Sequence, residues 1–122
     1  VLCAEGGCIV SDHVDILGAE YAIVIRSEAD DKKLEYCDGY CDWTVKLIAV
    51  KKQEREDDSL HDLALMEKQV LRHEIVHAFL LESGLGHNTI YGGAWAVNEE
   101  LVDWIALQGP KIYAAWQEAG AL

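Results

Sequence analysis

The stretch Leu71-Arg72-His73-Glu74-Ile75-Val76-His77-Ala78-Phe79-Leu80-Leu81 decides how the rest of the chain is interpreted. On a helix, His73 and His77 are four residues apart, so their side chains leave from one face. Two imidazoles at this spacing can bind one Zn²⁺ ion, and Glu74 can reach a metal-bound water as a general base. The stretch therefore predicts two metal ligands and a catalytic carboxylate on one helix.

The composition is typical of one soluble globular domain, which we expect to span residues 1–122. The formal net charge of −12 at pH 7 argues against nucleic acid and against anionic membrane surfaces as partners. No apolar run approaches the ~20 residues of a membrane span, and no signal peptide is visible. We therefore expect a cytoplasmic protein, and a monomer.

The first half of the chain predicts a small sheet. Residues 14–17 and 21–26 have the pattern of a β-hairpin, and residues 43–50 are rich in residues that favour strands. The simplest sheet has three strands, or four if an N-terminal arm over residues 1–12 adds one. Between these strands we expect a short helix within residues 28–36 and a turn at the Asp-Gly pair of residues 37–42.

The second half predicts helices. Apolar residues recur at helical spacing from about Ser59 to Glu82, and Ser83-Gly84 is a typical C-terminal cap. A loop over residues 85–93 leads to a second helix at 95–107, which we expect Gly109-Pro110 to end. A short last helix then covers residues 111–119. Strands followed by helices predict the α+β class.

A third metal ligand is predicted in the stretch Asn98-Glu99-Glu100-Leu101-Val102-Asp103. A catalytic zinc takes three protein ligands and leaves one position open. If Glu99 is the ligand, Asp103 lies one turn further on the same face and can accept the free N–H of a ligating histidine. Glu100 is the competing ligand, and it points about 100° away from Glu99, so both cannot ligate from one regular helix.

Other interpretations of these residues remain open. The His-Glu-x-x-His pattern can arise by chance on a helix that carries two surface histidines. A structural zinc would need a fourth ligand, often a cysteine, but no cysteine lies near the two predicted helices. We expect the four cysteines to be free thiols, with disulfides or a second metal site as alternatives; they are Cys3, Cys8, Cys37 and Cys41.

The pattern His73-Glu74-Ile75-Val76-His77 followed by Asn98-Glu99 and Asp103 resembles the gluzincin zincins, and most of all the minigluzincin-like metallopeptidase domains of phages and prophages. The resemblance covers about residues 14–120. It implies a small zincin-like domain whose twisted sheet packs on an active-site helix and a glutamate helix. It also implies Glu99 as the ligand and Asp103 as its supporting carboxylate. The gap between His77 and Glu99 is longer than in thermolysin-type members, so the loop between the helices departs from theirs.

Together these features predict a zinc metalloendopeptidase with a peptide or protein substrate. Glu74 would take a proton from the water and pass it to the leaving amine. The group that stabilises the developing oxyanion is expected to be His87 or Tyr91, with Tyr113 as a weaker candidate. The alternative function is a regulatory or binding protein of a mobile element that has this fold and little or no peptidase activity.

Three further expectations concern the surroundings of the site. Residues 43–50 would form the strand that pairs with an extended substrate, or else an internal core strand. The residues Trp95, Trp104 and Trp116 are expected in the core. The N-terminal arm could act as a plug that brings Cys3, Asp12 or His13 to the metal.

Overall fold

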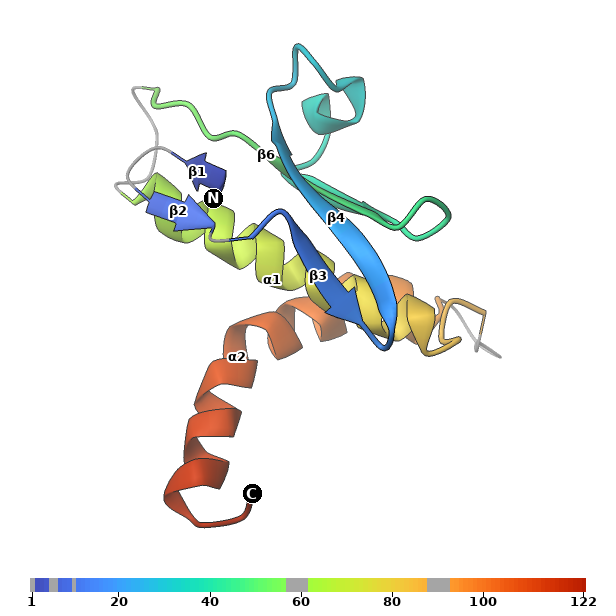
Figure 1. Cartoon of the computed structure of the whole chain (residues 1–122), viewed down its shortest axis with the longest axis vertical. Coiled ribbons are helices and arrows are strands. Elements are labelled where there is room, and N and C mark those ends of the chain that lie inside the picture. The colour runs from blue at the N-terminus through green and yellow to red at the C-terminus, as the bar shows by residue number, and fades with distance from the viewer. Residues whose placement is uncertain (1, 5–6, 10, 57–61, 88–92) are drawn as a thin grey trace.

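The computed structural model describes residues 2–4, 7–9, 11–56, 62–87 and 93–122 and has an α+β architecture. A four-stranded mixed sheet packs on one long helix, and a second long helix begins beside the first and then leaves the body (Figure 1). Within the described ranges, no helix has the length and apolarity that crossing a bilayer requires.

The predicted hairpin is confirmed, with a tighter turn than expected. Strand β3 (His13–Ile16) pairs antiparallel with β4 (Ala19–Arg26), and only Leu17 and Gly18 connect them. Both residues have positive φ, 54° and 90°, which is the backbone that a two-residue hairpin turn of matching twist needs. Tyr21 and Ile23 alternate toward the core from β4.

The prediction for residues 37–50 is wrong in detail. Gly39–Asp42 is strand β5 rather than a turn, and β6 begins only at Leu47 and runs to Lys51. The turn lies between them, because the Asp42 carboxylate accepts the Thr44 backbone N–H at 3.0 Å and Lys46 takes a positive φ of 56°. The strand order is β3-β4-β6-β5, with β6 parallel to β4 and antiparallel to β5. Strand β6 is therefore internal, and β5 and β3 are the two edge strands of this sheet.

The fourth strand of the main sheet is β5 and does not come from the N-terminal arm. Residues of the arm form a separate antiparallel hairpin of β1 (Leu2–Ala4) and β2 (Gly7–Ile9), which contacts the first long helix. The short helix expected within residues 28–36 is the 3₁₀ helix η1 (Lys32–Glu35), whose N-terminal N–H groups are capped by Asp31. Its Leu34 is fully buried.

Helix α1 (Leu63–Glu82) confirms the main helical prediction over its described length. The predicted start at Ser59 lies outside the described residues; Asp62 caps the first turn by accepting the Leu65 N–H at 2.9 Å. Ser83 and Gly84, the latter with φ 85°, end the helix as expected. The face that α1 buries includes three polar side chains, Glu67, Glu74 and His77.

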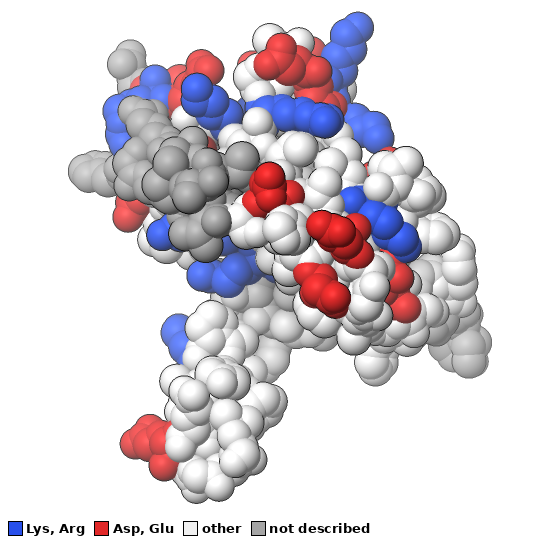
Figure 2. Space-filling view, in the orientation of Figure 1, with Lys and Arg blue, Asp and Glu red and all other residues white. Residues whose placement is uncertain are grey.

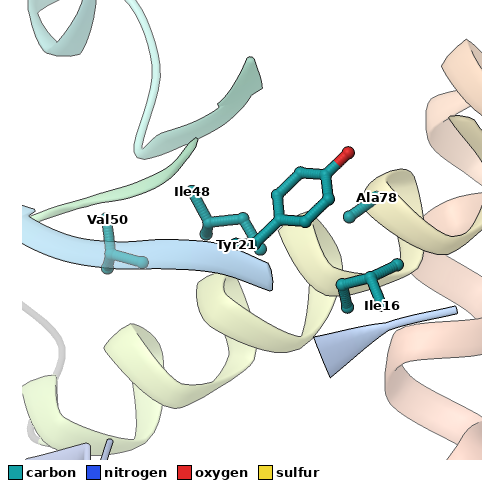
Figure 3. Packing of buried hydrophobic residues seen from close by; sticks show 5 residues of the cluster. All are labelled: Ile16, Tyr21, Ile48, Val50 and Ala78. Carbon is teal, nitrogen blue, oxygen red and sulfur yellow. The ribbon is translucent and has the colours of Figure 1, made fainter. Parts of the chain in front are cut away.

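The apolar core lies between the sheet and α1. Figure 3 shows five of its side chains, which converge from β3, β4, β6 and α1. They are Ile16, Tyr21, Ile48, Val50 and Ala78. Burying a large side chain of this kind stabilises a fold by about 1.5–3 kcal/mol. This packing fixes the orientation of α1, and the buried polar residues of α1 are held with it.

Helix α2 (Glu99–Glu118) contradicts the prediction that Gly109-Pro110 ends a helix and that a separate short helix follows. Pro110 has no N–H for the carbonyl of Ala106 one turn earlier. The guanidinium of Arg72 on α1 donates to that carbonyl instead, at 3.1 Å from Nε. The helix therefore continues through the proline, and its C-terminal half turns away from the body (Figure 1).

The three tryptophans are not core residues, so that expectation is also wrong. Trp95, in the short 3₁₀ helix η2 (Trp95–Val97), is 59 % exposed, and Trp104 and Trp116 on α2 are 56 % and 52 % exposed. Small and branched residues of α2, Val102 and Ala106, are buried in their place. The face in Figure 2 shows mixed acidic and basic side chains over the body and few charges on the projecting half of α2.

Candidate metal centre

Two helices bring the predicted metal ligands together. His73 and His77 lie on the face of α1 that meets the beginning of α2, and His77 is buried. Glu99 is the first residue of α2. The Asn98 side chain caps this helix by accepting the Leu101 N–H at 3.0 Å, which fixes where the helix starts and hence where Glu99 lies.

The ligand atoms of the three residues converge. The Nε2 atoms of His73 and His77 are 3.0 Å apart; that of His73 lies 3.0 Å from Glu99 Oε2, and that of His77 lies 3.0 Å from Glu99 Oε1. Among the described residues these three form the one group of His, Cys, Asp or Glu whose ligand atoms lie within 4.8 Å of one another. Glu100, the competing candidate, is not part of it.

The outer nitrogens of both imidazoles are held by acceptors. His73 Nδ1 lies 2.5 Å from Asp103 Oδ1, and His77 Nδ1 lies 2.5 Å from the carbonyl oxygen of Ala96. Because a carboxylate and a carbonyl oxygen can only accept, each Nδ1 carries the hydrogen. In the neutral imidazoles both Nε2 atoms then present lone pairs, and these face each other and the Glu99 carboxylate.

This arrangement of donors fits a divalent cation. Lone pairs and a carboxylate that face one another at 3.0 Å repel unless a positive charge lies between them. The three residues offer ligand atoms within 4.8 Å of one another, a spacing compatible with one zinc ion bound at about 2 Å. Two imidazoles and one carboxylate are also a typical ligand set of catalytic zinc, and they leave a coordination position open.

Glu74 lies next to this group and is almost fully buried, with 6 % of its surface exposed. Burial raises its pKa to about 7, His73 opposes that shift, and the charges of Glu99 and Asp103 add to it. It accepts no hydrogen bond from the residues that the structure describes. A buried carboxyl without a protein donor is available to a water or a bound ligand.

Two cavities, of about 470 and 340 Å³, flank the metal-ligand group. Both are lined by His73, Glu74 and Glu99, together with Cys37 and Gly39 beside them. The larger one, which we call the α2 cavity, is completed by Asp38, Met66, Gln69, Val70, Asp103 and the pair Ala106 and Leu107. The smaller one, the β5 cavity, is completed by Tyr40, Cys41, His77, Leu81 and Val97. The candidate site is thus a two-sided cleft with the metal ligands between its halves.

The structure does not bring the predicted oxyanion-stabilising residues to the cleft. His87 is exposed after the end of α1 and lines neither cavity. Tyr113 is half exposed on the projecting part of α2 and also lines neither. Tyr91 lies outside the described residues. Asp12 and His13 contact each other at 2.9 Å beside β3, the sheet edge opposite β5, so they do not act as a plug in this structure.

The cleft also contains residues that the sequence did not single out for it. The carbonyl of Ala96 orients His77, and Gly39 allows β5 to approach Glu74 closely. Cys37 and Cys41 line the cleft as free thiols, and burial raises both pKa values, that of Cys41 to about 12. Cys3 and Cys8 lie where side chains are not described. Of these residues, only Cys37 and Cys41 carry a signal in the sequence, because they flank the Asp-Gly pair at which β5 begins.

No protein-family model, curated protein or solved structure matches this chain.

Proposed function

We propose that this chain is a zinc-dependent metallopeptidase with a zincin-like fold. The convergence of His73, His77 and Glu99 beside the buried Glu74 carries the proposal. The α+β arrangement supports it, because an edge strand runs beside the helix that bears both histidines. The proposal therefore rests on the geometry of the site and not on similarity to a known protein.

The residues of the cleft have distinct roles in this proposal. His73, His77 and Glu99 would hold Zn²⁺, which when bound would supply an acidified water and polarise the scissile carbonyl. Glu74 would take the proton of the attacking water and deliver it to the amine nitrogen as the C–N bond breaks. Asp103 and the Ala96 carbonyl keep both imidazoles in the tautomer that presents Nε2.

The substrate in this proposal is an extended peptide segment. Among the described strands, β5 pairs with β6 alone, so its other side can offer backbone donors and acceptors to a further strand. A peptide can add to such an edge as a further strand, while its side chains enter neighbouring pockets. The β5 cavity includes residues of β5 itself, so a peptide bound there lies directly over the metal ligands.

Metal analysis and one substitution test the proposal. We expect the purified chain to bind one zinc ion, and excess zinc at 100 times Kd to stabilise it by about 2.7 kcal/mol. Glu74→Gln should retain zinc and lose at least a hundredfold in hydrolysis of an unbiased peptide mixture. Glu100→Gln, the matched control one helix away, should change neither property.

The outcomes separate the two functions considered from the sequence. A chain that neither binds nor is stabilised by zinc would refute the metal centre itself. Zinc binding without hydrolysis of any peptide would instead favour a regulatory or binding protein. Hydrolysis that persists unchanged in Glu74→Gln would show that the role given to Glu74 is wrong.

A further inference from the structure

The two halves of the cleft differ in charge. Apart from the residues that they share, the β5 cavity is lined by Tyr40, Cys41, His77, Leu81 and Val97, none of which is acidic. The α2 cavity adds two carboxylates, Asp38 just before β5 and Asp103 from α2. Both halves share Glu74 and Glu99, so a peptide that passes over the metal ligands meets additional acidic groups on the α2 side only.

The floor of the α2 cavity is apolar. Met66 and Val70 come from α1, and Ala106 and Leu107 come from α2, so the floor is built where the two helices pack together. The volume of the whole α2 cavity, about 470 Å³, lies in the range of small-ligand pockets. It is large enough for a large aliphatic or aromatic side chain. Burying such a side chain there would gain the usual free energy of apolar transfer.

The negative charge of this half exceeds what a metal ion can neutralise. Four carboxylates line it, those of Asp38, Glu74, Glu99 and Asp103, against the two positive charges of Zn²⁺. No Lys or Arg is among the described residues that line the cavity, and the guanidinium of Arg72 is directed at the Ala106 carbonyl. Even without Glu74, the carboxylates of Asp38, Glu99 and Asp103 outnumber the two positive charges of the ion. A second observation also points to a ligand in this cavity: the Glu74 carboxyl is buried and accepts no hydrogen bond from the described part of the chain.

We propose that the α2 cavity is a specificity subsite that binds an apolar side chain of the substrate and favours a Lys or Arg beside it. The apolar side chain lies on the floor between α1 and α2, and the cationic group faces Asp38 at the rim. Asp38 is suited to this role because it is exposed and, within the described part of the chain, its carboxylate has a single long contact, 3.5 Å, with the Gln53 amide. This inference rests on the proposed function for its substrate, a peptide.

Binding to an inactive variant tests the subsite separately from hydrolysis. Zinc-loaded Glu74→Gln is titrated with four capped hexapeptides that differ only at two adjacent positions, Leu-Lys, Leu-Gln, Leu-Glu and Ser-Lys. We expect the Leu-Lys peptide to bind most tightly and the Leu-Glu peptide most weakly. Adding Asp38→Asn should reduce the preference for Lys over Gln by about two- to fivefold, the range of a solvent-exposed ion pair.

Two further variants complete the design. Asp12→Asn removes the same charge at the opposite edge of the sheet, so it should leave the Lys preference unchanged. Leu107→Asn should weaken the preference for Leu over Ser by about tenfold, since the floor loses apolar contact with the side chain. Leu107 is half exposed, so this substitution spares the core.

Each outcome decides one question. Equal binding of the Leu-Lys and Leu-Glu peptides, or a Lys preference that Asp38→Asn leaves intact, overturns the subsite while hydrolysis by the unaltered chain still supports the peptidase. Selective binding that depends on Asp38, combined with no hydrolysis by the zinc-loaded unaltered chain, upholds the subsite and refutes the peptidase.

Discussion

Gly39 is the residue at which β5 comes close to Glu74 on α1. A Cβ atom at this position would lie 2.7 Å from Val70 Cγ1, 2.9 Å from the Ala49 carbonyl and 3.3 Å from Glu74 Cγ. Gly39→Ala should therefore destabilise the fold by about 1–3 kcal/mol, since neither the backbone nor the helix can give way without repacking. The loss should appear as a lower midpoint of denaturant unfolding.

Gly109→Ala is the matched control for this prediction. A Cβ at Gly109 meets nothing within 4 Å, and the residue lies inside α2. Alanine there should stabilise the helix by about 0.5–1 kcal/mol. Opposite signs for the two glycines would support the close approach of β5 to Glu74. A neutral Gly39→Ala would mean that β5 is not held against α1.

Asp103 should affect metal affinity through the orientation of His73. Removing its acceptor from His73 Nδ1 frees the ring to rotate and to change tautomer. Asp103→Ala should weaken zinc binding about 10- to 100-fold, as is typical when the partner of a ligating histidine is lost. Competition with a chromogenic chelator measures this directly. A loss of the same size in Glu100→Gln would mean that the general acidity of α2, rather than the contact to His73, sets the affinity.

Among single residues, the sequence predicts those whose positions follow from helical spacing. His73, Glu74 and His77 share one helix, and Glu99 and Asp103 are four apart on another, so the periodicity alone places each set on one face. The Ala96 carbonyl and the space beside Gly39 depend on how separate elements pack together. No local pattern encodes such contacts, so they could not be predicted.

At the scale of elements, Arg72 explains why α2 continues through Pro110. The Ala106 carbonyl is partly buried and receives its hydrogen bond from Arg72 because the proline cannot supply one. Arg72→Met should destabilise the fold by about 1–2 kcal/mol, since it leaves this carbonyl without a donor. In Pro110→Ala the restored backbone N–H of residue 110 can donate to the Ala106 carbonyl in place of Arg72.

A double-mutant cycle tests this compensation. Arg72→Met should cost less in the Pro110→Ala background than in the unaltered chain, by about 1 kcal/mol of the free energy of unfolding. Urea unfolding of the four chains gives the coupling. Strictly additive effects would show that the Arg72 contact and the proline are independent.

The prediction of elements succeeded where one local signal dominated and failed where two signals competed. The 3.6-residue period of α1 and the alternation in β4 had no competitor. The Asp38-Gly39 pair predicted a turn, but packing against α1 makes it the start of an edge strand. Pro110 predicted a helix end, but a side chain from another helix satisfies the carbonyl that it leaves open. Both failures reflect tertiary contacts that override local preference.

At the scale of the whole molecule, one polar cluster ties three parts of the fold together. The Glu82 carboxylate, near the end of α1, accepts hydrogen bonds from the Tyr21 hydroxyl of β4, at 2.6 Å, and from Lys46 in the turn before β6. Lys46 also lies over the rings of Tyr21 and Trp43. The cluster closes the end of the core that is opposite the start of α1.

This cluster predicts how stability depends on pH. The hydrogen bonds from Lys46 and Tyr21 hold the pKa of Glu82 below its usual value of 4.5. A carboxyl whose pKa is lower in the folded state stabilises the fold above its unfolded pKa, and this contribution disappears as the pH falls through the folded value. Glu82→Gln should therefore be less stable than the unaltered chain at pH 7, and the difference should shrink steadily below about pH 4.

Urea unfolding between pH 3 and pH 7 measures this difference, with Glu118→Gln as the control. Glu118 ends α2, is exposed and forms no ion pair within the described part of the chain. Its substitution nevertheless removes one negative charge from the net charge of −12, as Glu82→Gln does. Because less negative charge reduces self-repulsion, Glu118→Gln should be neutral or slightly stabilising at pH 7. Glu82→Gln gains the same relief, so a net loss at pH 7 would show that the specific contacts outweigh it. If both substitutions stabilise equally, the charge of the whole molecule governs its stability and the cluster does not.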